Sequence, residues 1–423
     1  MAIINEGAAS RIEKQAIKAK KAAKRMRVIT ETEKNDALYA LAGNLEKNMD
    51  LILVENKKDT DAGQKKGYDA AYIDRLSLDE DRVADFAKSL REVAELEDPV
   101  GETLSSRLLE NGLKAEKIRV PLGVIGMIYE ARPNVTVDAA GLALKSGNAV
   151  ILKGGSSAIH SNKAIVSVMH EALASTAIPQ DAVQFIESTD RSAAKELFKM
   201  KEHIDVLIPR GGGALIRDTL EHATVPVLET GVGNCHLYID READTTKAVS
   251  ILINAKTDRP AVCNALETLI VHEKWLKENS NALITAVSEH GIRVHGDEKA
   301  VRFISDAKPA GEADWRDEYL SLDLAVKVVS TFGEACDHIE TYGTKHSEAI
   351  VTENPETAKA FFGAVDAAAL YHNASTRFTD GGALGFGAEI GISTQKLHAR
   401  GPMGLKDLTT FKYIMTGNGH IRT

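Results

Sequence analysis

The sequence predicts an α/β protein with two doubly wound domains, and three observations lead to that fold class. Short apolar runs alternate with helix-like segments from about residue 121. A second series of the same kind begins near residue 242, and the first hundred residues read as helix. Strands that alternate with helices in this way indicate a parallel sheet with helices on its faces. Ligands on such sheets bind where the loops follow the carboxyl ends of the strands.

The N-terminal region is predicted to be helical. Thr30 and Glu33 stand ahead of apolar residues that recur at helical spacing, which is the pattern of a capping box. A lysine-rich patch at residues 18–27 resembles part of a transit peptide, but Glu6 and Glu13 interrupt that pattern. The patch is more simply the solvated face of a helix.

The two series supply the strands and helices of the predicted sheets. The first contains predicted strands at residues 121–130, 148–153, 183–188, 204–209 and 225–229, with helices at 156–176 and 191–200. The second contains predicted helices at residues 247–256 and 273–291, with strands at 267–273, 292–297, 324–330, 347–352 and 368–373.

Two further β segments lie outside both series. Asn111–Gly112 separates two strand-like arms, which is a strong hairpin signal, and the chain ends in a strand-like segment at residues 411–423. A lone hairpin buries too little surface to be stable. We therefore expect these segments to pair with each other or with a neighbouring subunit.

Composition excludes several classes of protein. Lysine and arginine total 52, and aspartate and glutamate total 61, so the formal net charge is −9. Nucleic acid and anionic membranes both require a basic face, so neither is the expected main partner. No apolar run approaches the length of a membrane span, and three cysteines fit a reducing compartment. We expect a cytoplasmic protein.

Motifs for metal binding and for hydrolytic triads are missing from the sequence. It contains no HExxH, no paired CxxC and no GxSxG. We therefore expect no metal cofactor.

Two glycine-rich loops follow predicted strands and open predicted helices, at residues 153–162 and 209–218. Each places backbone N–H groups at a helix N-terminus, where an anionic phosphate is stabilised. Neither loop matches GxGxxG or a P-loop, and most glycine turns are only turns. Two such loops at successive strand ends favour an atypical dinucleotide site.

These motifs together resemble the aldehyde dehydrogenase superfamily and, within it, the gamma-glutamyl phosphate reductases of proline biosynthesis. The resemblance covers nearly the whole chain. Its most specific parts are residues 127–162, 209–217, 228–236, 257–269 and 375–405.

The resemblance implies an aldehyde-dehydrogenase-like fold with three parts. An NADPH-binding, Rossmann-like domain with the N-terminal helices would comprise residues 1–104 and 122–229. A catalytic domain would comprise residues 230–400, and a β oligomerisation element would comprise residues 105–121 and 401–423. A homo-oligomer is implied.

The resemblance also implies roles for individual residues. Cys263 falls where the family has its nucleophilic thiol, on a loop that we expect to lead into a helix whose dipole would stabilise a thiolate. Asn134 resembles the asparagine whose amide helps to form the oxyanion hole. Lys153 resembles the lysine that holds the adenosine ribose, and Glu318 the carboxylate that binds the nicotinamide ribose. Gly211, Gly212 and Gly213 resemble the loop under the pyrophosphate.

Two positions depart from the wider superfamily. Many members have a glutamate three residues after that lysine, which repels a 2′-phosphate, whereas this chain has Ser156, which points to NADPH. Glu229 aligns with the residue that activates hydrolytic water in aldehyde-oxidising relatives, and its role here is open.

The implied reaction is reduction of L-glutamyl 5-phosphate to L-glutamate 5-semialdehyde and phosphate through a Cys263 thioester. Asn373, Ser375 and Arg377 are candidates for binding the substrate α-carboxylate, although they could equally fix the end of a strand. Association with glutamate 5-kinase is also implied.

Two alternatives stay open. One is a water-using, NAD-dependent aldehyde dehydrogenase. The other is a non-catalytic subunit or scaffold that keeps the fold, perhaps beside an upstream kinase.

Overall fold

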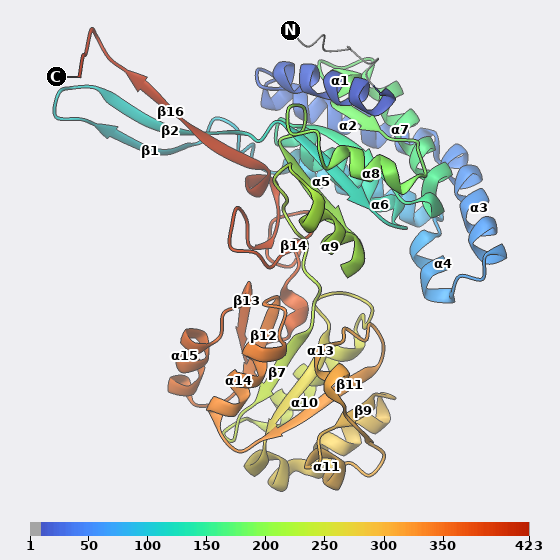
Figure 1. The fold of residues 1–423 in the computed structure, drawn as a ribbon, viewed down its shortest axis with the longest axis vertical. Coiled ribbons are helices and arrows are strands. Elements are labelled where there is room, and N and C mark those ends of the chain that lie inside the picture. The colour runs from blue at the N-terminus through green and yellow to red at the C-terminus, as the bar shows by residue number, and fades with distance from the viewer. Residues whose placement is uncertain (1–9, 423) are drawn as a thin grey trace, which may run out of the picture. The chain divides into compact units, whose positions relative to one another are not determined.

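The computed structural model describes residues 10–422, which form two compact units (Figure 1). Unit 1 contains the described chain up to Thr230, residues 386–391 and the segment from Met403 onward. Unit 2 contains residues 231–385 and 392–402. The first division lies one residue from the expected boundary at 229/230. Residues 386–391 belong to unit 1, although the sequence grouped them with the catalytic domain.

A four-stranded parallel sheet forms the centre of unit 1. Its strands, in spatial order, are β5 (Val183–Phe185), β4 (Ala149–Lys153), β3 (Val124–Tyr129) and β6 (Val206–Arg210). Every residue of β3 and β4 is buried. A parallel strand covered on both faces has a continuous apolar run rather than an alternating one, which is the pattern that predicted these strands.

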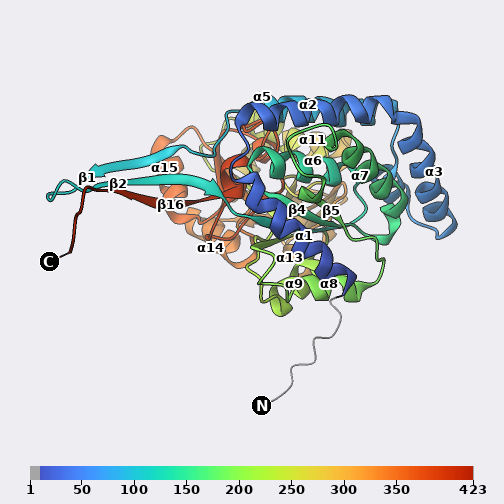
Figure 2. The same cartoon turned by 90° about the horizontal axis from the view of Figure 1, so that it is seen from above.

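Helices pack around this sheet, and some of them follow its strands in the sequence. The helices are α1 (Arg11–Met26), α2 (Glu31–Lys47), α3 (Met49–Lys65), α4 (Ala70–Leu76), α5 (Glu80–Glu95), α6 (Pro133–Lys145), α7 (Ile159–Leu173), α8 (Arg191–Leu197) and α9 (Gly213–His222). The predicted capping box is confirmed, since the Glu33 backbone N–H donates to Thr30 and the Thr30 N–H donates to Glu33. Helix α2 packs against α5 and α7 (Figure 2).

The strand predicted at residues 225–229 is absent from unit 1. Only a single bridge joins Leu207 to Val227, where the Leu207 N–H donates to the Pro226 carbonyl and the Leu228 N–H donates to the Leu207 carbonyl. Pro226 has no N–H, so the ladder cannot extend through it. The prediction of a strand here was wrong.

A second, three-stranded antiparallel sheet of unit 1 extends away from its helices (Figures 1 and 2). It consists of β1 (Thr103–Leu108), β2 (Lys114–Pro121) and β16 (Thr409–Thr416), with β2 in the middle. Gly112 has φ +84° in the hairpin turn, a conformation that favours glycine. The expected pairing of the hairpin with the C-terminal strand is confirmed within one chain, because all eight residues of β16 pair with β2.

Unit 2 is built on a seven-stranded parallel sheet. Its strands, in spatial order, are β10 (Lys308–Pro309), β9 (Arg293–Gly296), β11 (Asp323–Val329), β8 (Leu266–His272), β7 (Cys235–Ile239), β12 (Ser347–Val351) and β13 (Ala369–His372). A separate two-stranded sheet, β14 (Ile392–Ser393) with β15 (Gly401–Pro402), follows β13 in the sequence. The predicted second α/β series is confirmed.

Helices cover both faces of this sheet. They are α10 (Thr245–Thr257), α11 (Glu273–Glu289), α12 (Ala300–Phe303), α13 (Glu312–Arg316), α14 (Phe332–Tyr342) and α15 (Pro355–Ala364). Leu269 packs in one core cluster with Trp275 of α11, whereas the next residue, Ile270, packs in another with Phe361 of α15. Successive side chains of a strand point to opposite faces, so a single buried strand serves two cores. Within residues 10–422, no helix has the length and apolarity that crossing a membrane requires.

Candidate active site

Cys263 lies half-buried in a turn of unit 2 between α10, which ends at Thr257, and β8, which begins at Leu266. No helix starts at this cysteine, so the predicted helix after it was wrong and the expected helix-dipole effect on its thiol has no local source. The strand predicted at residues 267–273 is confirmed as β8, which bonds to β7 on one side and to β11 on the other. Its start three residues after Cys263 leaves no room for a helix.

The backbone of Cys263 is held by a close approach from Gly233. A Cβ built on Gly233 would overlap the carbonyl group of Cys263 and lie 2.7 Å from its Cα, so only glycine fits there. The buried Cys235 Sγ donates to the Cys263 carbonyl oxygen at 3.2 Å. The backbone of the candidate nucleophile is therefore held in place by Gly233, just before β7, and by Cys235, the first residue of β7.

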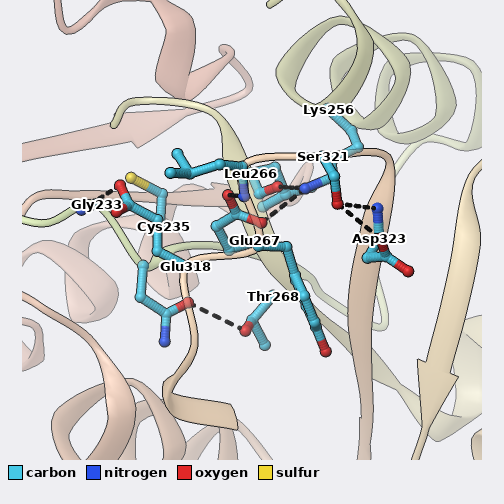
Figure 3. Close-up of polar contacts among 12 residues, drawn as sticks. Gly233, Cys235, Lys256, Leu266, Glu267, Thr268, Glu318, Ser321 and Asp323 are labelled. Atoms are coloured by element: carbon cyan, nitrogen blue, oxygen red, sulfur yellow. Dashed lines mark hydrogen bonds and ion pairs between the residues drawn. The ribbon is translucent and has the colours of Figure 1, made fainter. Parts of the chain in front are cut away.

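Glu318 contacts the same segment. Its Oε1 accepts the Gly233 N–H at 2.9 Å (Figure 3). Burial raises the pKa of Glu318, and the hydrogen bond from Gly233 opposes that rise. Unit 2 thus links Glu318 and Cys263, both suggested by the sequence, through one glycine.

The other two cysteines differ in their chemistry. Burial raises the pKa of Cys235 well above its usual value, and it raises the pKa of Cys336 to about 11. Because the thiolate is the nucleophile, these raised pKa values disfavour both thiols as nucleophiles near neutral pH. This leaves Cys263 as the candidate nucleophile among the three cysteines of the chain.

A buried ion pair connects the two ends of the Cys263 turn. Lys256, in the last turn of α10, donates to Glu267 Oε2 and to the Leu266 carbonyl, each at 2.7 Å (Figure 3). Glu267 also accepts the Leu320 N–H at 3.1 Å. Burial raises the pKa of Glu267 to about 7, even though the charge of Lys256 opposes that rise. The pair fixes where the turn leaves the helix and where it enters the strand.

Ser375 and Arg377 lie close to the residue that follows Cys263. Arg377 contacts the Asn264 side chain and pairs with Asp258 through its Nε at 3.0 Å. The Ser375 Oγ accepts the Arg377 N–H at 3.2 Å. These contacts place the 375–377 segment against the nucleophile turn and show that the guanidinium already has protein partners.

Asn373 lies apart from that cluster. Its side chain accepts the Thr352 N–H and donates to the Thr352 carbonyl, both at 3.0 Å, beyond the carboxyl end of β12. Cys263 precedes β8 and so lies at the amino end of the same parallel sheet. The structure therefore brings Ser375 and Arg377, but not Asn373, to the Cys263 turn.

Unit 1 contains a cavity of about 610 Å³ at the carboxyl ends of β3 and β4. Lys153 and Ser156, both suggested by the sequence, line it together with Ser157, Tyr72 and Leu215 of α9. Lys153 is buried, which lowers its pKa, and its Nζ donates to the Gly154 carbonyl at 2.9 Å. Small-molecule sites have volumes of roughly 300–1,000 Å³. A buried cation and three hydroxyls in such a cavity fit part of a dinucleotide.

The glycine loop at residues 211–213 opens α9, as the sequence predicted, but it already has an acidic partner. The Gly212 N–H donates to Glu130 Oε2 at 3.0 Å, and a Cβ on Gly211 would lie 2.6 Å from the same oxygen. Glu130 also lines the 610 Å³ cavity. A bound pyrophosphate would need the N–H groups that this carboxylate now uses. Glu130 was not among the predicted site residues, although an acidic residue directly after the central strand β3 was a signal.

Asn134 lies in the first turn of α6, where Pro133 starts the helix. Its amide nitrogen donates to Asp138 Oδ2 at 3.1 Å, one helical turn further on. Both residues line a second cavity of unit 1, of about 150 Å³. Burial raises the pKa of Asp138 to about 6. Asp138 was also missed from the sequence, because only the fold shows that it faces a cavity.

No group of three or more His, Cys, Asp or Glu side chains is arranged to hold a metal ion in the part of the chain that the structure describes.

Comparison with known proteins identifies the family. The model of the aldehyde dehydrogenase family matches residues 1–302. The chain belongs to the aldehyde dehydrogenase family. It is 79% identical to gamma-glutamyl phosphate reductase 2 of Bacillus licheniformis over 422 residues, which covers 100% of both chains. It is 57% identical to gamma-glutamyl phosphate reductase of Bacillus cereus, covering 96% of this chain and 98% of that relative.

A solved structure agrees with this assignment. The crystal structure of gamma-glutamyl phosphate reductase from Thermotoga maritima superposes with a TM-score of 0.96 at 49% identity, covering 98% of this chain and 100% of that one. The predicted aldehyde-dehydrogenase-like α/β fold is confirmed. The chain is an oxidoreductase of a family whose members use nicotinamide cofactors and are generally oligomeric.

Proposed function

We propose that the protein reduces L-glutamyl 5-phosphate to L-glutamate 5-semialdehyde and phosphate with NADPH, as the second step of proline biosynthesis from glutamate. The name shared by its relatives supports the substrate. The observation that carries the chemistry is the Cys263 turn, whose carbonyl is fixed by Gly233 and Cys235 while Glu318 bonds to Gly233. A nucleophile needs such a fixed backbone to meet an acyl carbon in one geometry.

In the proposed reaction, the Cys263 thiolate attacks the acyl carbon, the bond from that carbon to the phosphate oxygen breaks, and phosphate leaves with the bonding electrons. The Asn134 amide would donate to the acyl oxygen as negative charge develops there, an interaction worth roughly 3–4 kcal/mol. To do so, its nitrogen must turn from Asp138 or share its two N–H groups between them. The nicotinamide cofactor supplies the hydride that reduces the thioester. The resulting hemithioacetal on Cys263 then collapses, which frees the semialdehyde and the thiol.

For the cofactor, we propose that Lys153 and Ser156 hold the adenosine ribose and its 2′-phosphate, and that Gly211, Gly212 and Gly213 underlie the pyrophosphate. A hydroxyl at Ser156 accepts a phosphate where a carboxylate would repel it, and Lys153 adds a nearby cation. Glu318 would bind the nicotinamide ribose. These roles favour NADPH over NADH.

The substrate α-carboxylate needs donors, and the 375–377 segment remains the sequence-based candidate. Ser375 and Arg377 lie against the nucleophile turn, which supports it, but Arg377 is also paired with Asp258. Asn373 would have to bind the α-carboxylate from its position beside Thr352, to whose carbonyl its side chain donates. A homo-oligomer in the cytoplasm, associated with glutamate 5-kinase, completes the proposal.

A spectrophotometric assay tests the proposal in the oxidative direction. L-Glutamate 5-semialdehyde, NADP⁺ and phosphate are supplied together, and each is then omitted in turn. We expect NADPH to form only when all three are present. Turnover without phosphate would instead indicate the water-using dehydrogenase, and no turnover at all would favour a non-catalytic role.

Variants identify the groups involved. Cys263→Ala should abolish turnover but keep NADPH binding, because the covalent intermediate is lost while the cofactor loops are intact. Cys336→Ala is the matched control and should keep the parental rate. Glu229→Gln should retain phosphate-dependent turnover within about tenfold, because an anionic phosphate gains little from a general base. A loss of about 100-fold in this variant would mean that Glu229 acts as a base.

A further inference from the structure

The cavity beside Asn134 is small and carries charges of both signs. It has a volume of about 150 Å³ and lies at the N-terminal end of α6 in unit 1. Two guanidinium groups, Arg132 and Arg210, and two carboxylates, Asp138 and Glu389, contribute to its lining. One water molecule occupies roughly 30 Å³ of liquid, so the cavity has room for about five heavy atoms. An α-amino-acid head group has five.

Asp138 is the best-defined carboxylate of this cavity. It accepts hydrogen bonds from Asn134 at 3.1 Å and from Ser89 of α5 at 3.4 Å. Both of these donors are neutral, and the charge of Arg210 lowers the pKa of Asp138. Asp138 is half-buried, and a carboxylate whose hydrogen-bond donors are neutral is stabilised when a cation reaches it. A cationic ligand group is therefore the natural partner for this side of the cavity.

The chemistry of the lining separates the possible ligands. A free phosphate would meet Arg132 and Arg210, but its two negative charges would also meet Asp138 and Glu389. A simple aldehyde has no charged group that would match either sign of the lining. An α-amino acid presents an ammonium and a carboxylate on one carbon, and so matches a lining of mixed sign.

We propose that this cavity recognises the α-amino-acid head of the acyl substrate, with Asp138 and Glu389 receiving its α-ammonium group. Arg132 and Arg210 would then replace the 375–377 segment as the partners of its α-carboxylate. The proposal rests on the proposed function, in which the Asn134 amide binds the acyl oxygen of the same molecule. Since Asn134 lines the cavity, the reacting end and the head group of one substrate would meet the same end of α6. Asp138 and Glu389 would then exclude acyl phosphates and aldehydes that lack an amino group.

The test compares two aldehydes that differ only in the amino group. L-Glutamate 5-semialdehyde and 5-oxopentanoate are each oxidised with NADP⁺ and phosphate by the parent, by Asp138→Asn and by Glu389→Gln. Hydrogen bonds between charged groups contribute roughly 1.5–3 kcal/mol, which is about 10–100-fold in affinity. We expect Asp138→Asn to lower kcat/KM for the semialdehyde by that factor, and kcat/KM for 5-oxopentanoate by less than about threefold.

The ratio of kcat/KM for the two aldehydes separates a loss of amino-group recognition from a structural effect on Asn134. Asp138 also accepts a hydrogen bond from Asn134, so its loss could disturb the oxyanion donor. Both aldehydes use that donor equally, and a purely structural effect would therefore lower both rates together. Glu389→Gln provides a second variant on a different segment, should Asp138→Asn fail to fold.

Each outcome has one meaning. An unchanged ratio in both variants overturns the proposal, and so does a fall in the KM for phosphate in Asp138→Asn, which would make the cavity a phosphate site. If the parent oxidises neither aldehyde with phosphate, the proposed function itself fails. If the parent oxidises both equally well, that function stands and amino-group recognition does not.

Discussion

Replacing Gly233 by alanine tests whether backbone crowding fixes the nucleophile. The added methyl group would overlap the Cys263 carbonyl and come within 2.7 Å of its Cα. Carbon atoms in ordinary contact are about 3.5–4.0 Å apart, so the two backbones must separate by roughly 1 Å. The Cys235–Cys263 hydrogen bond lies across the gap that would open, and the Gly233–Glu318 hydrogen bond is made by the residue that must move.

The expected loss follows from that displacement. A misplacement of about 1 Å can reduce the rate of an enzyme by ~100-fold. Two weakened hydrogen bonds would lower the free energy of unfolding by about 1–3 kcal/mol. We therefore expect Gly233→Ala to reduce kcat/KM at least 100-fold, while urea unfolding shows a folded and moderately destabilised protein.

Gly231→Ala is the matched control. The atoms nearest to a Cβ at that position belong to the side chain of Thr394, whereas those nearest to a Cβ on Gly233 belong to the backbone of Cys263. The activity of Gly231→Ala should stay within about threefold of the parent. The reasoning would be refuted by a Gly233→Ala protein that keeps parental activity and stability, because the close approach would then be irrelevant to the Cys263 geometry.

Three other predictions concern stability, pH and assembly. Lys256→Met should lower the free energy of unfolding in urea by about 3 kcal/mol or more, because it leaves Glu267 buried without its cation, and Lys256→Met/Glu267→Met should recover most of that loss. The pKa of Asp138 is near 6, and protonation below that pH removes its negative charge. We therefore expect kcat/KM for the amino-bearing semialdehyde to fall about tenfold per pH unit below pH 6, whereas kcat/KM for 5-oxopentanoate should show no such fall. A flat ratio of the two profiles would argue against recognition by Asp138. Deleting residues 411–423 should leave monomers or aggregates in light scattering, because one edge of β2 loses most of its pairing with β16; a native oligomer would contradict this role of β16.

Much of the fold could be predicted because buried parallel strands carry continuous apolar runs. The segment at residues 148–153 matches β4, and the segment at 347–352 matches β12, to within one residue at each end. The errors have physical causes that one-dimensional patterns do not contain. Pro226 stops a ladder that the apolar residues around it suggest, and the start of β8 three residues after Cys263 leaves no room for the helix expected there.

The candidate site was predictable where residues are contiguous and less so where the fold assembles them. Glycine loops and the Cys263 motif are visible in the sequence. Glu130 and Asp138 lie within the same recognised motif, but their relation to α9 and to a cavity depends on how β3, α6 and β6 pack. The contacts of Arg377 with Asp258 likewise join residues 119 positions apart.

The chain passes between the two units four times, after Thr230, Gly385, Gly391 and Pro402. The order of these crossings determines which unit can complete its fold first while the chain is being synthesised. Arg119 of β2 donates to Thr409 of β16, 290 residues later. At ~5–20 residues per second, a ribosome leaves the edge of β2 open for roughly 15–60 s. Unit 2 has all seven strands of its large sheet once residue 372 has emerged, whereas unit 1, although begun first, is finished last. The nascent chain must therefore protect an unpaired β edge through most of its own translation, and its final residues end that exposure.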